Sequence, residues 1–306
     1  MSATAELRKL RSGRSAAKQQ NKAAFFFLLP WFLGLFVITV GPMATSLYLS
    51  FTDYNLLQDP SFTGLDNFSR MLSDERLHHS LQVTFTYVLV SVPLQLALAL
   101  ALAIFLDRGL RGLAFYRSIF YLPSLLGASV AIAVLWRTVF GADGLFNEGL
   151  GLVGIEGRGW ISEPETALWT LIILNVWTFG SPMVIFLAGL RQIPASYYEA
   201  ASIDGANRWR QFWSVTLPLL TPIVFFNLVL QIIHAFQSFT QAFIVSGGTG
   251  GPADSTLFYS LYLYQRGFGN FDMGYASALA WLLLLMVGAF TAINFWASKY
   301  WVFYND

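Results

Sequence analysis

The chain contains no cysteine among its 306 residues and few charged side chains. The absence of cysteine excludes disulfides and thiolate chemistry. Only 11% of the residues are charged, whereas 56% are hydrophobic and 17% are aromatic, and the mean hydropathy is +0.55. This composition is too apolar for a water-soluble domain, so we expect a membrane protein.

Several motifs that carry chemistry are also missing. No G-x-x-x-x-G-K-[ST] loop occurs, so the chain is not expected to bind a nucleotide by that device. Neither H-E-x-x-H nor G-x-S-x-G is present, and His78, His79 and His234 do not make a convincing metal site. Basic residues are scattered without a folded basic face, which gives no case for nucleic acid. The sequence predicts a protein that is not an enzyme and holds no metal or cofactor of its own.

Apolar runs are the dominant feature of the sequence. A helix needs roughly 20 apolar residues to cross a bilayer, and no run shows the alternation of a barrel strand. The sequence therefore predicts an all-α membrane protein with six transmembrane helices in one domain, residues 23–306, and the prolines within these runs predict kinks. The runs lie near 24–50, 81–105, 117–140, 167–190, 217–245 and 276–298.

Basic residues indicate how the spans are oriented. The tail 1–22 carries six of them, and Arg108, Arg111, Arg191 and Lys299 mark alternate loops, whereas the remaining loops are acidic. Cytoplasmic loops are enriched in lysine and arginine, so we expect both termini inside a multi-pass cell-membrane protein. The first run is longer than the core of a signal peptide, which favours an uncleaved span.

The fourth loop, residues 191–218, is the longest connection predicted on the cytoplasmic side. Ser196 and Glu199 have the spacing of a capping box, which predicts the start of a short helix there. Gly205 can end that helix in the left-handed conformation, and Asn207 can cap a second one. The loop should therefore fold as helix, turn, helix. From these residues alone, its exposed face could rest on the membrane surface or on another protein.

This loop resembles the EAA loop of permease subunits in bacterial ABC importers. The match begins with Glu-Ala-Ala-x-x-Asp-Gly-Ala and continues to Pro222. The resemblance implies a bundle like that of type I ABC importer permeases and a coupling helix seated in a cytoplasmic ATPase, which would bind ATP and Mg. The positions to which it assigns coupling are Glu199, Ala200, Ala201, Asp204, Gly205, Ala206 and Pro218.

The resemblance extends along most of the chain, which is similar to the first permease subunit of the carbohydrate uptake group. It implies four kinds of partner besides lipid: a second permease, two copies of the ATPase, an extracytoplasmic solute-binding protein and a carbohydrate. The binding protein would meet the outer face near 247–252. Read without the resemblance, that stretch is a surface turn followed by interfacial aromatics, Tyr259, Tyr262 and Tyr264. The stretches that match are 50–54, 64–68, 93–95, 121–123, 186–190, 250–252 and 271–276.

Polar residues in the middle of spans are candidates for a solute pathway. In the fifth run they recur at steps of four, three, four and three, which predicts one face of a single helix. Neutral amides and hydroxyls suit a hydroxyl-rich solute, although such residues can also hydrogen-bond between helices. The candidates are Asn227, Gln231, His234, Gln237, Ser238 and Gln241, with Asn175 and Trp177 in the fourth run.

The leading interpretation is one transmembrane half of an ATP-driven carbohydrate importer. An ion-coupled secondary transporter or channel is the alternative from another class. Such a protein should carry acids inside the membrane or a repeat with broken helices. No acid lies near the middle of any predicted span, which counts against it.

Overall fold

The computed structural model describes residues 25–107 and 112–303, and these residues are helical almost throughout. The only extended pairing among them is an isolated antiparallel bridge between Thr52 and Phe62. The predicted tail 1–22, Arg108 and Arg111 lie outside the described residues. The elements are η1 (Leu35–Val40), α2 (Gly41–Leu49), α3 (Asp66–Met71), α4 (Glu75–Asp107), α5 (Leu113–Leu126), α6 (Val130–Val139), α7 (Leu145–Gly151), α8 (Pro164–Trp177), α9 (Gly180–Leu190), α10 (Ala195–Ile203), α11 (Arg208–Gln211), η2 (Phe212–Thr216), α12 (Leu217–Phe236), α13 (Thr240–Val245), η3 (Pro252–Asp254), α14 (Tyr259–Tyr264), η4 (Gln265–Gly269) and α15 (Met273–Trp301).

Six apolar segments correspond to the six predicted spans, which confirms the all-α membrane fold. Five of them are long and apolar enough to cross a bilayer as they stand, and the sixth is a bent pair, α5 and α6, whose axes differ by 93°. The third predicted span, 117–140, is therefore not one straight helix. The five continuous segments are Phe25–Leu49, Glu75–Asp107, Pro164–Leu190, Arg208–Val245 and Met273–Trp301.

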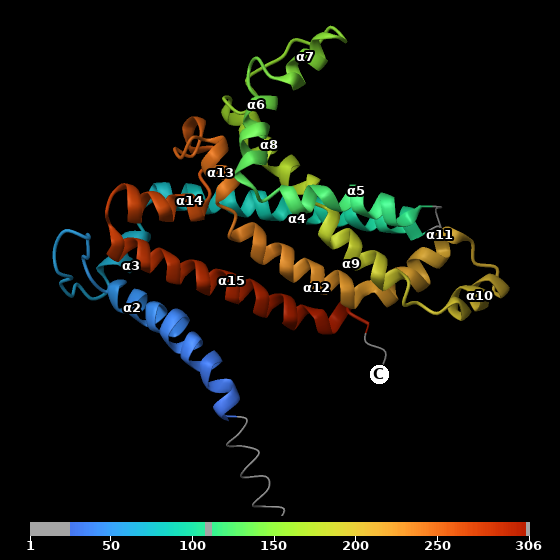
Figure 1. Ribbon diagram of the computed structural model, residues 1–306, viewed down its shortest axis with the longest axis horizontal. Helices are drawn as coiled ribbons and strands as arrows, with labels where there is room; N and C mark the ends of the chain where they lie inside the picture. The colour runs from blue at the N-terminus through green and yellow to red at the C-terminus, as the bar shows by residue number, and fades with distance from the viewer. Residues whose placement is uncertain (1–24, 108–111, 304–306) are drawn as a thin grey trace, which may run out of the picture.

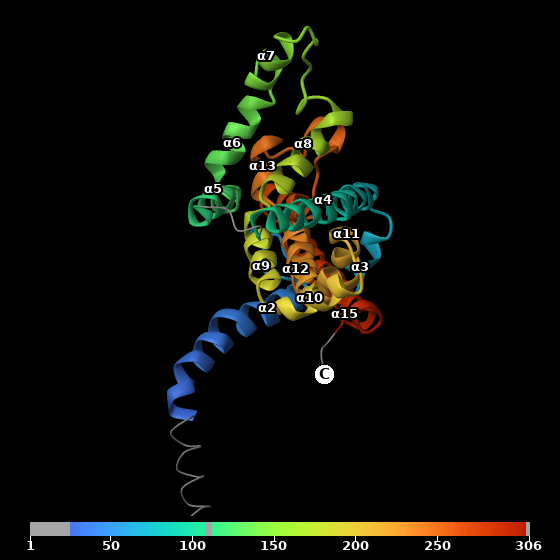
Figure 2. The ribbon, with the colours of Figure 1, turned by 90° about the vertical axis from the view of Figure 1, so that its right-hand side faces the viewer.

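Helix α4 is the centre of the bundle. It runs for 33 residues without interruption, although Pro93 lies inside it. It packs against α8, α9 and α12 (Figures 1 and 2). Ala99 and Ala103 are fully buried on α4, and such small side chains let neighbouring helices approach closely. The helix thus provides a continuous wall to which the interrupted segments attach.

The first apolar segment stands apart from that bundle. Phe25–Leu49 has none of its apolar window buried within the described chain. Its main contact is between α2 and α15, and the remainder points away from the bundle (Figure 1). A helix that is apolar all round and uncovered by its own chain must be covered by lipid or by another subunit.

Most prolines of the predicted spans lie inside continuous helix and not at a break. Pro93, Pro123 and Pro222 lie within α4, α5 and α12, which continue past them. Helix is interrupted instead at 127–129, 178–179 and 237–239. These three joints come together around one cavity. The break at 178–179 does have a local cause, because Pro182 has no N–H for the Thr178 carbonyl, which instead accepts from Ser124 and Gln95.

Candidate functional site

The loop at 191–218 contains a short helix, a turn and a second helix, as predicted. Its first helix, α10, begins at Ala195 after Pro194, and Ser196 makes no capping hydrogen bond. The predicted capping box is therefore wrong. The N-cap is Pro194, with an extended ψ of 137°, so the helix begins two residues earlier than the capping box requires and Ser196 falls within its first turn.

The turn after α10 forms as its residue types predict. Gly205 has φ +76°, a conformation that glycine adopts without strain. The Ala206 amide donates to the Ala201 carbonyl at 2.9 Å, which closes the end of the helix. Asn207 Oδ1 then accepts from the Arg210 amide at 2.9 Å and caps α11.

Helix α10 is held at its base and is otherwise free of the bundle (Figure 1). The Tyr198 hydroxyl lies 3.0 Å from Thr216 Oγ1, at the foot of α12. Ile203 is 87% exposed, although an apolar side chain is normally covered. Of the predicted coupling residues, Glu199, Ala200, Asp204 and Gly205 are exposed, and Ala201, Ala206 and Pro218 are half-buried.

A cavity of about 380 Å³ lies where the three interrupted spans meet. The predicted stripe is not on a single helix, because α12 ends at Phe236, residues 237–239 are not helical and α13 begins at Thr240. Most of its members still reach the cavity, because the joint carries Gln237 and Ser238 into its wall. The predicted residues that line it are Asn175, Gln231, His234, Gln237, Ser238 and Gln241.

Two of the predicted pathway residues lie elsewhere. Asn227 is fully buried and is not part of the cavity lining. Its amide oxygen and nitrogen have no hydrogen-bond partner within the described chain. Trp177 is also outside the lining, and its ring packs against Trp136 with the centroids 6.0 Å apart.

Two further residues of the cavity wall, Gln95 and Ser124, were not singled out from the sequence. Ser124 Oγ donates to the Thr178 carbonyl at 2.7 Å, and Gln95 Nε2 donates to the same carbonyl at 3.1 Å. Gln241 Nε2 donates to the Gly127 carbonyl at 3.1 Å. An interrupted membrane helix leaves backbone groups that need partners, and these side chains supply them. Their polar character inside apolar runs is the signal that could have identified them.

Two residues of the cavity wall also have buried polar atoms without a partner in the described chain. The Gln95 amide nitrogen is bonded to Thr178, which leaves its Oε1 as a buried acceptor with no donor in the described chain. One buried amide nitrogen of Asn175 also lacks a partner. Such groups are costly in an apolar medium unless a solute or water pairs with them. The other amides and hydroxyls of the lining, among them Gln231, Gln237 and Ser238, suit a molecule that both donates and accepts hydrogen bonds, as hydroxyls do.

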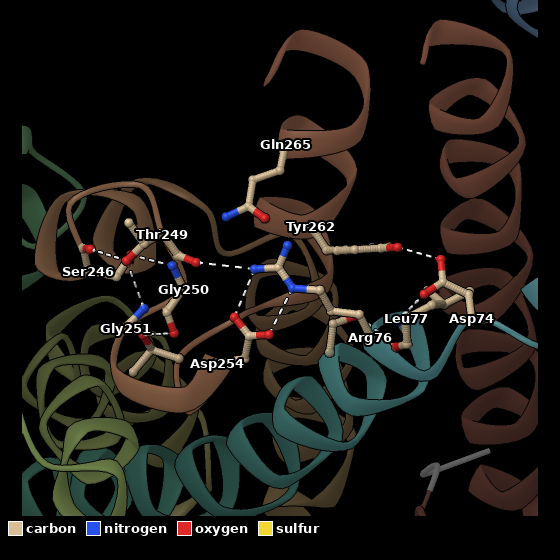
Figure 3. Close-up of polar contacts among 12 residues, drawn as sticks. Asp74, Arg76, Leu77, Ser246, Thr249, Gly250, Gly251, Asp254, Tyr262 and Gln265 are labelled. Atoms are coloured by element: carbon tan, nitrogen blue, oxygen red, sulfur yellow. Dashed lines mark hydrogen bonds and ion pairs between the residues drawn. The ribbon is translucent and has the colours of Figure 1, made fainter. Parts of the chain in front are cut away.

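A polar cluster centred on Asp74 joins the start of α4 to α14 and α15. Asp74 accepts from the hydroxyl of Tyr262 (Figure 3). It also accepts from the Tyr275 hydroxyl at 2.7 Å and lies 3.5 Å from Arg266. Tyr259 and Tyr262 are fully buried, so the prediction of interfacial aromatics is wrong for them, while Tyr264 is 37% exposed. Tyr259 and Tyr262 are buried because their hydroxyls bond groups far away in the sequence, the Leu279 carbonyl and Asp74.

Ionisation of this cluster is set by burial and by its donors. Burial alone would raise the pKa of Asp74, but the hydrogen bonds from Tyr262, Tyr275 and the Leu77 amide, together with Arg266, outweigh it and hold that pKa below its ordinary value. Burial, reinforced by the Asp74 carboxylate, raises the pKa of Tyr262 to about 12. At neutral pH the carboxylate is charged and the phenol remains a donor.

A second ion pair fixes the glycine-rich turn at 247–252. The Arg76 guanidinium binds both carboxylate oxygens of Asp254 at 2.8 Å, and it lies 3.4 Å from the Thr249 carbonyl (Figure 3). Gly250 and Gly251 have φ +97° and +78° in this turn. The turn is therefore an ordered surface tied to the start of α4.

Comparison with known proteins places this architecture in a family. Residues 83–300 match the model of the binding-protein-dependent transport system inner membrane component. The chain is 54% identical to the probable ABC transporter permease protein YesP of Bacillus subtilis over 97% of this chain and 96% of that protein. It is 33% identical to the lactose transport system permease protein LacF of Rhizobium radiobacter, over 94% of this chain and 98% of that protein.

A solved structure shares the fold. The crystal structure of a bacterial alginate ABC transporter, in complex with an alginate pentasaccharide-bound periplasmic protein, contains a chain that superimposes with a TM-score of 0.78. The two chains are 20% identical, and the match covers 92% of this chain and 95% of the other. With a family match over most of its length, the chain belongs to the binding-protein-dependent transport system inner membrane components and is a sugar-type ABC transporter permease, not an enzyme.

Proposed function

We propose that this chain forms one half of the transmembrane pathway of an importer that moves a carbohydrate into the cytoplasm. In this proposal both termini are cytoplasmic, and a second permease completes the pathway. Two copies of a separate ATPase bind ATP and Mg and drive transport through α10. A solute-binding protein delivers the solute at the outer face.

The observation that carries the proposal is the chemistry of the cavity wall. Its described lining contains amides, hydroxyls, one histidine and aromatic rings, and no Asp, Glu, Lys or Arg. Sugars are recognised by many neutral hydrogen bonds together with contacts to aromatic rings. The name of the relative that carries lactose supports the same class of solute. An ion-coupled transporter would instead need an acid in the pathway, and none lines this cavity.

Coupling can be tested at the turn after α10. Proline at Gly205 cannot adopt φ +76°, whereas asparagine tolerates that region. We expect Gly205→Pro to reduce ATP-driven uptake by at least tenfold and to weaken co-purification of the ATPase, while Gly205→Asn retains both. Uptake is measured in proteoliposomes that contain the whole complex, with a panel of neutral sugars, polyols and glycerol phosphates. Wild-type uptake rates in the Gly205→Pro protein would refute coupling through α10.

The solute pathway can be tested at Gln231. Its side chain lines the cavity and has no hydrogen bond within the described residues, so its loss should not weaken the fold. We expect Gln231→Leu to lower uptake roughly tenfold, the effect of about 1.4 kcal/mol of lost binding to the moving solute. Asn294→Leu is the matched control, because Asn294 bonds only the Phe290 carbonyl on α15. Equal uptake by the two variants would exclude Gln231 from the pathway.

A further inference from the structure

A second hollow, of about 460 Å³, lies on the side of the chain that carries α10. We call it the α11 groove. Its apolar wall is formed by Ile104, Leu190 and Phe212, and its rim by Arg208, Trp209 and Asp107. Asp107 and Leu190 are the last residues of α4 and α9, and α12 begins soon after Phe212. The groove therefore lies at the depth where three spans leave the bilayer.

The charge at this rim is positive. Arg208 and Arg210 flank Trp209 on α11, and within the described chain neither guanidinium pairs with a carboxylate. The Asp107 carboxylate is 3.4 Å from Arg191, which neutralises the one acid in the lining. Unpaired arginines at the end of a span attract anionic headgroups, and a guanidinium can hold a phosphate through two hydrogen bonds.

Aromatic side chains next to the arginines are also typical of the boundary between lipid headgroups and acyl chains. Trp209 is 70% exposed and Trp213 is 52% exposed, with their rings 5.7 Å apart. Phe212 packs edge-on to Trp213 at 5.2 Å. Exposed indoles are typical of the boundary between headgroups and acyl chains, where one end of the ring is wet and the other is apolar. In bulk water the same surface would be an uncovered apolar patch.

We propose that the α11 groove binds an anionic phospholipid. Its phosphate lies on Arg208, its glycerol region lies beside Trp209, and an acyl chain covers Ile104 and Leu190. Tyr198 of α10 also lines the groove, so the bound lipid braces the helix to which coupling is assigned. Lipid binding at this groove does not depend on which solute is carried. The lipid proposal can therefore be refuted while the proposed transport function stands.

The experiment uses the whole complex in nanodiscs that contain either brominated phosphatidylglycerol or brominated phosphatidylcholine at the same mole fraction. Bromine quenches indole fluorescence at short range. The chain has 10 tryptophans, so the readout is the difference between wild type and Trp209→Phe. We expect phosphatidylglycerol to quench wild type more than phosphatidylcholine does, and Trp209→Phe to remove that excess.

Arg208→Gln should weaken the excess about fivefold, the effect of one lost arginine contact at an anionic surface. Arg158→Gln, which removes the same charge from an exposed outer position, should leave it unchanged. No excess in wild type, or an excess that survives Arg208→Gln, overturns the proposal. An excess seen only when the ATPase is absent also overturns it, because the groove would then be covered by protein in the working complex.

Discussion

Alanine in place of Gly180 is expected to lower the stability of the folded chain by about 3 kcal/mol, the upper part of the range for overpacking. Gly180 is buried at the start of α9, where it touches α5. A Cβ atom there would lie 2.5 Å from the Phe120 carbonyl oxygen and 2.8 Å from Tyr121 Cα. Both are backbone atoms, so relief requires that the two helices separate.

The measurement is the apparent melting temperature of the complex in mild detergent, and a decrease of about 5 to 10 °C is expected. Gly288→Ala is the control, because Gly288 also lies in a helix but has nothing within 4 Å of an added Cβ. That substitution should be neutral or stabilise by about 1 kcal/mol through helix propensity. If the two variants melt alike, close packing at the α5–α9 contact is not a determinant of stability.

Removal of the Asp74 carboxylate is expected to lower the stability of the folded chain about as much as Gly180→Ala does. Its side chain is only 6% exposed and accepts from two buried tyrosines, so Asp74→Ala leaves Tyr262, Tyr275 and Arg266 without their acceptor. Breaking a buried charged network of this kind costs about 3 kcal/mol. Asp272→Asn is the control, because Asp272 pairs with Arg70 at a more exposed position and should matter by less than about 1 kcal/mol.

The lowered pKa of Asp74 predicts how the stability difference between wild type and Asp74→Ala depends on pH. Because the pKa of Asp74 is lowered in the folded chain, its contribution is complete above the unfolded value of about 4 and is lost only as the pH falls through the folded value. The gap in melting temperature between wild type and Asp74→Ala should stay constant from pH 8 to pH 5. It should shrink below about pH 4. A gap that already closes between pH 7 and pH 6 would contradict this assignment.

Local signals in the sequence were sufficient for the turn and the second helix of the 191–218 loop, but not for the start of its first helix. Gly205 and Asn207 act through their own backbone and the next few residues, so the turn and the second cap could be predicted without knowing the fold. The bend at 127–129 also has a local signal that was not used. Ser129 Oγ accepts from the Ile132 amide at 3.3 Å, which is the cap of a new helix, α6.

Long-range partners explain what the sequence did not predict. The spacing of polar residues in the fifth run fits one helix, but the chain breaks at 237–239, where the Ser238 carbonyl accepts from Ser260 and Gln241 reaches Gly127. Tyr262 has the composition of an interfacial residue, yet its acceptor Asp74 lies 188 positions away. Periodicity does not show such partners, because they depend on which helices pack together.

The helix breaks at 127–129, 178–179 and 237–239 limit how the selectivity of the cavity can change. Several of the hydrogen-bond acceptors there, at Gly127, Thr178 and Ser238, are main-chain carbonyls. A point mutation alters a side chain and leaves a carbonyl in place. The backbone acceptors therefore form an invariant part of the wall. A shift in preference from one solute to another must arise at the side chains around them or, in the proposed complex, on the second permease.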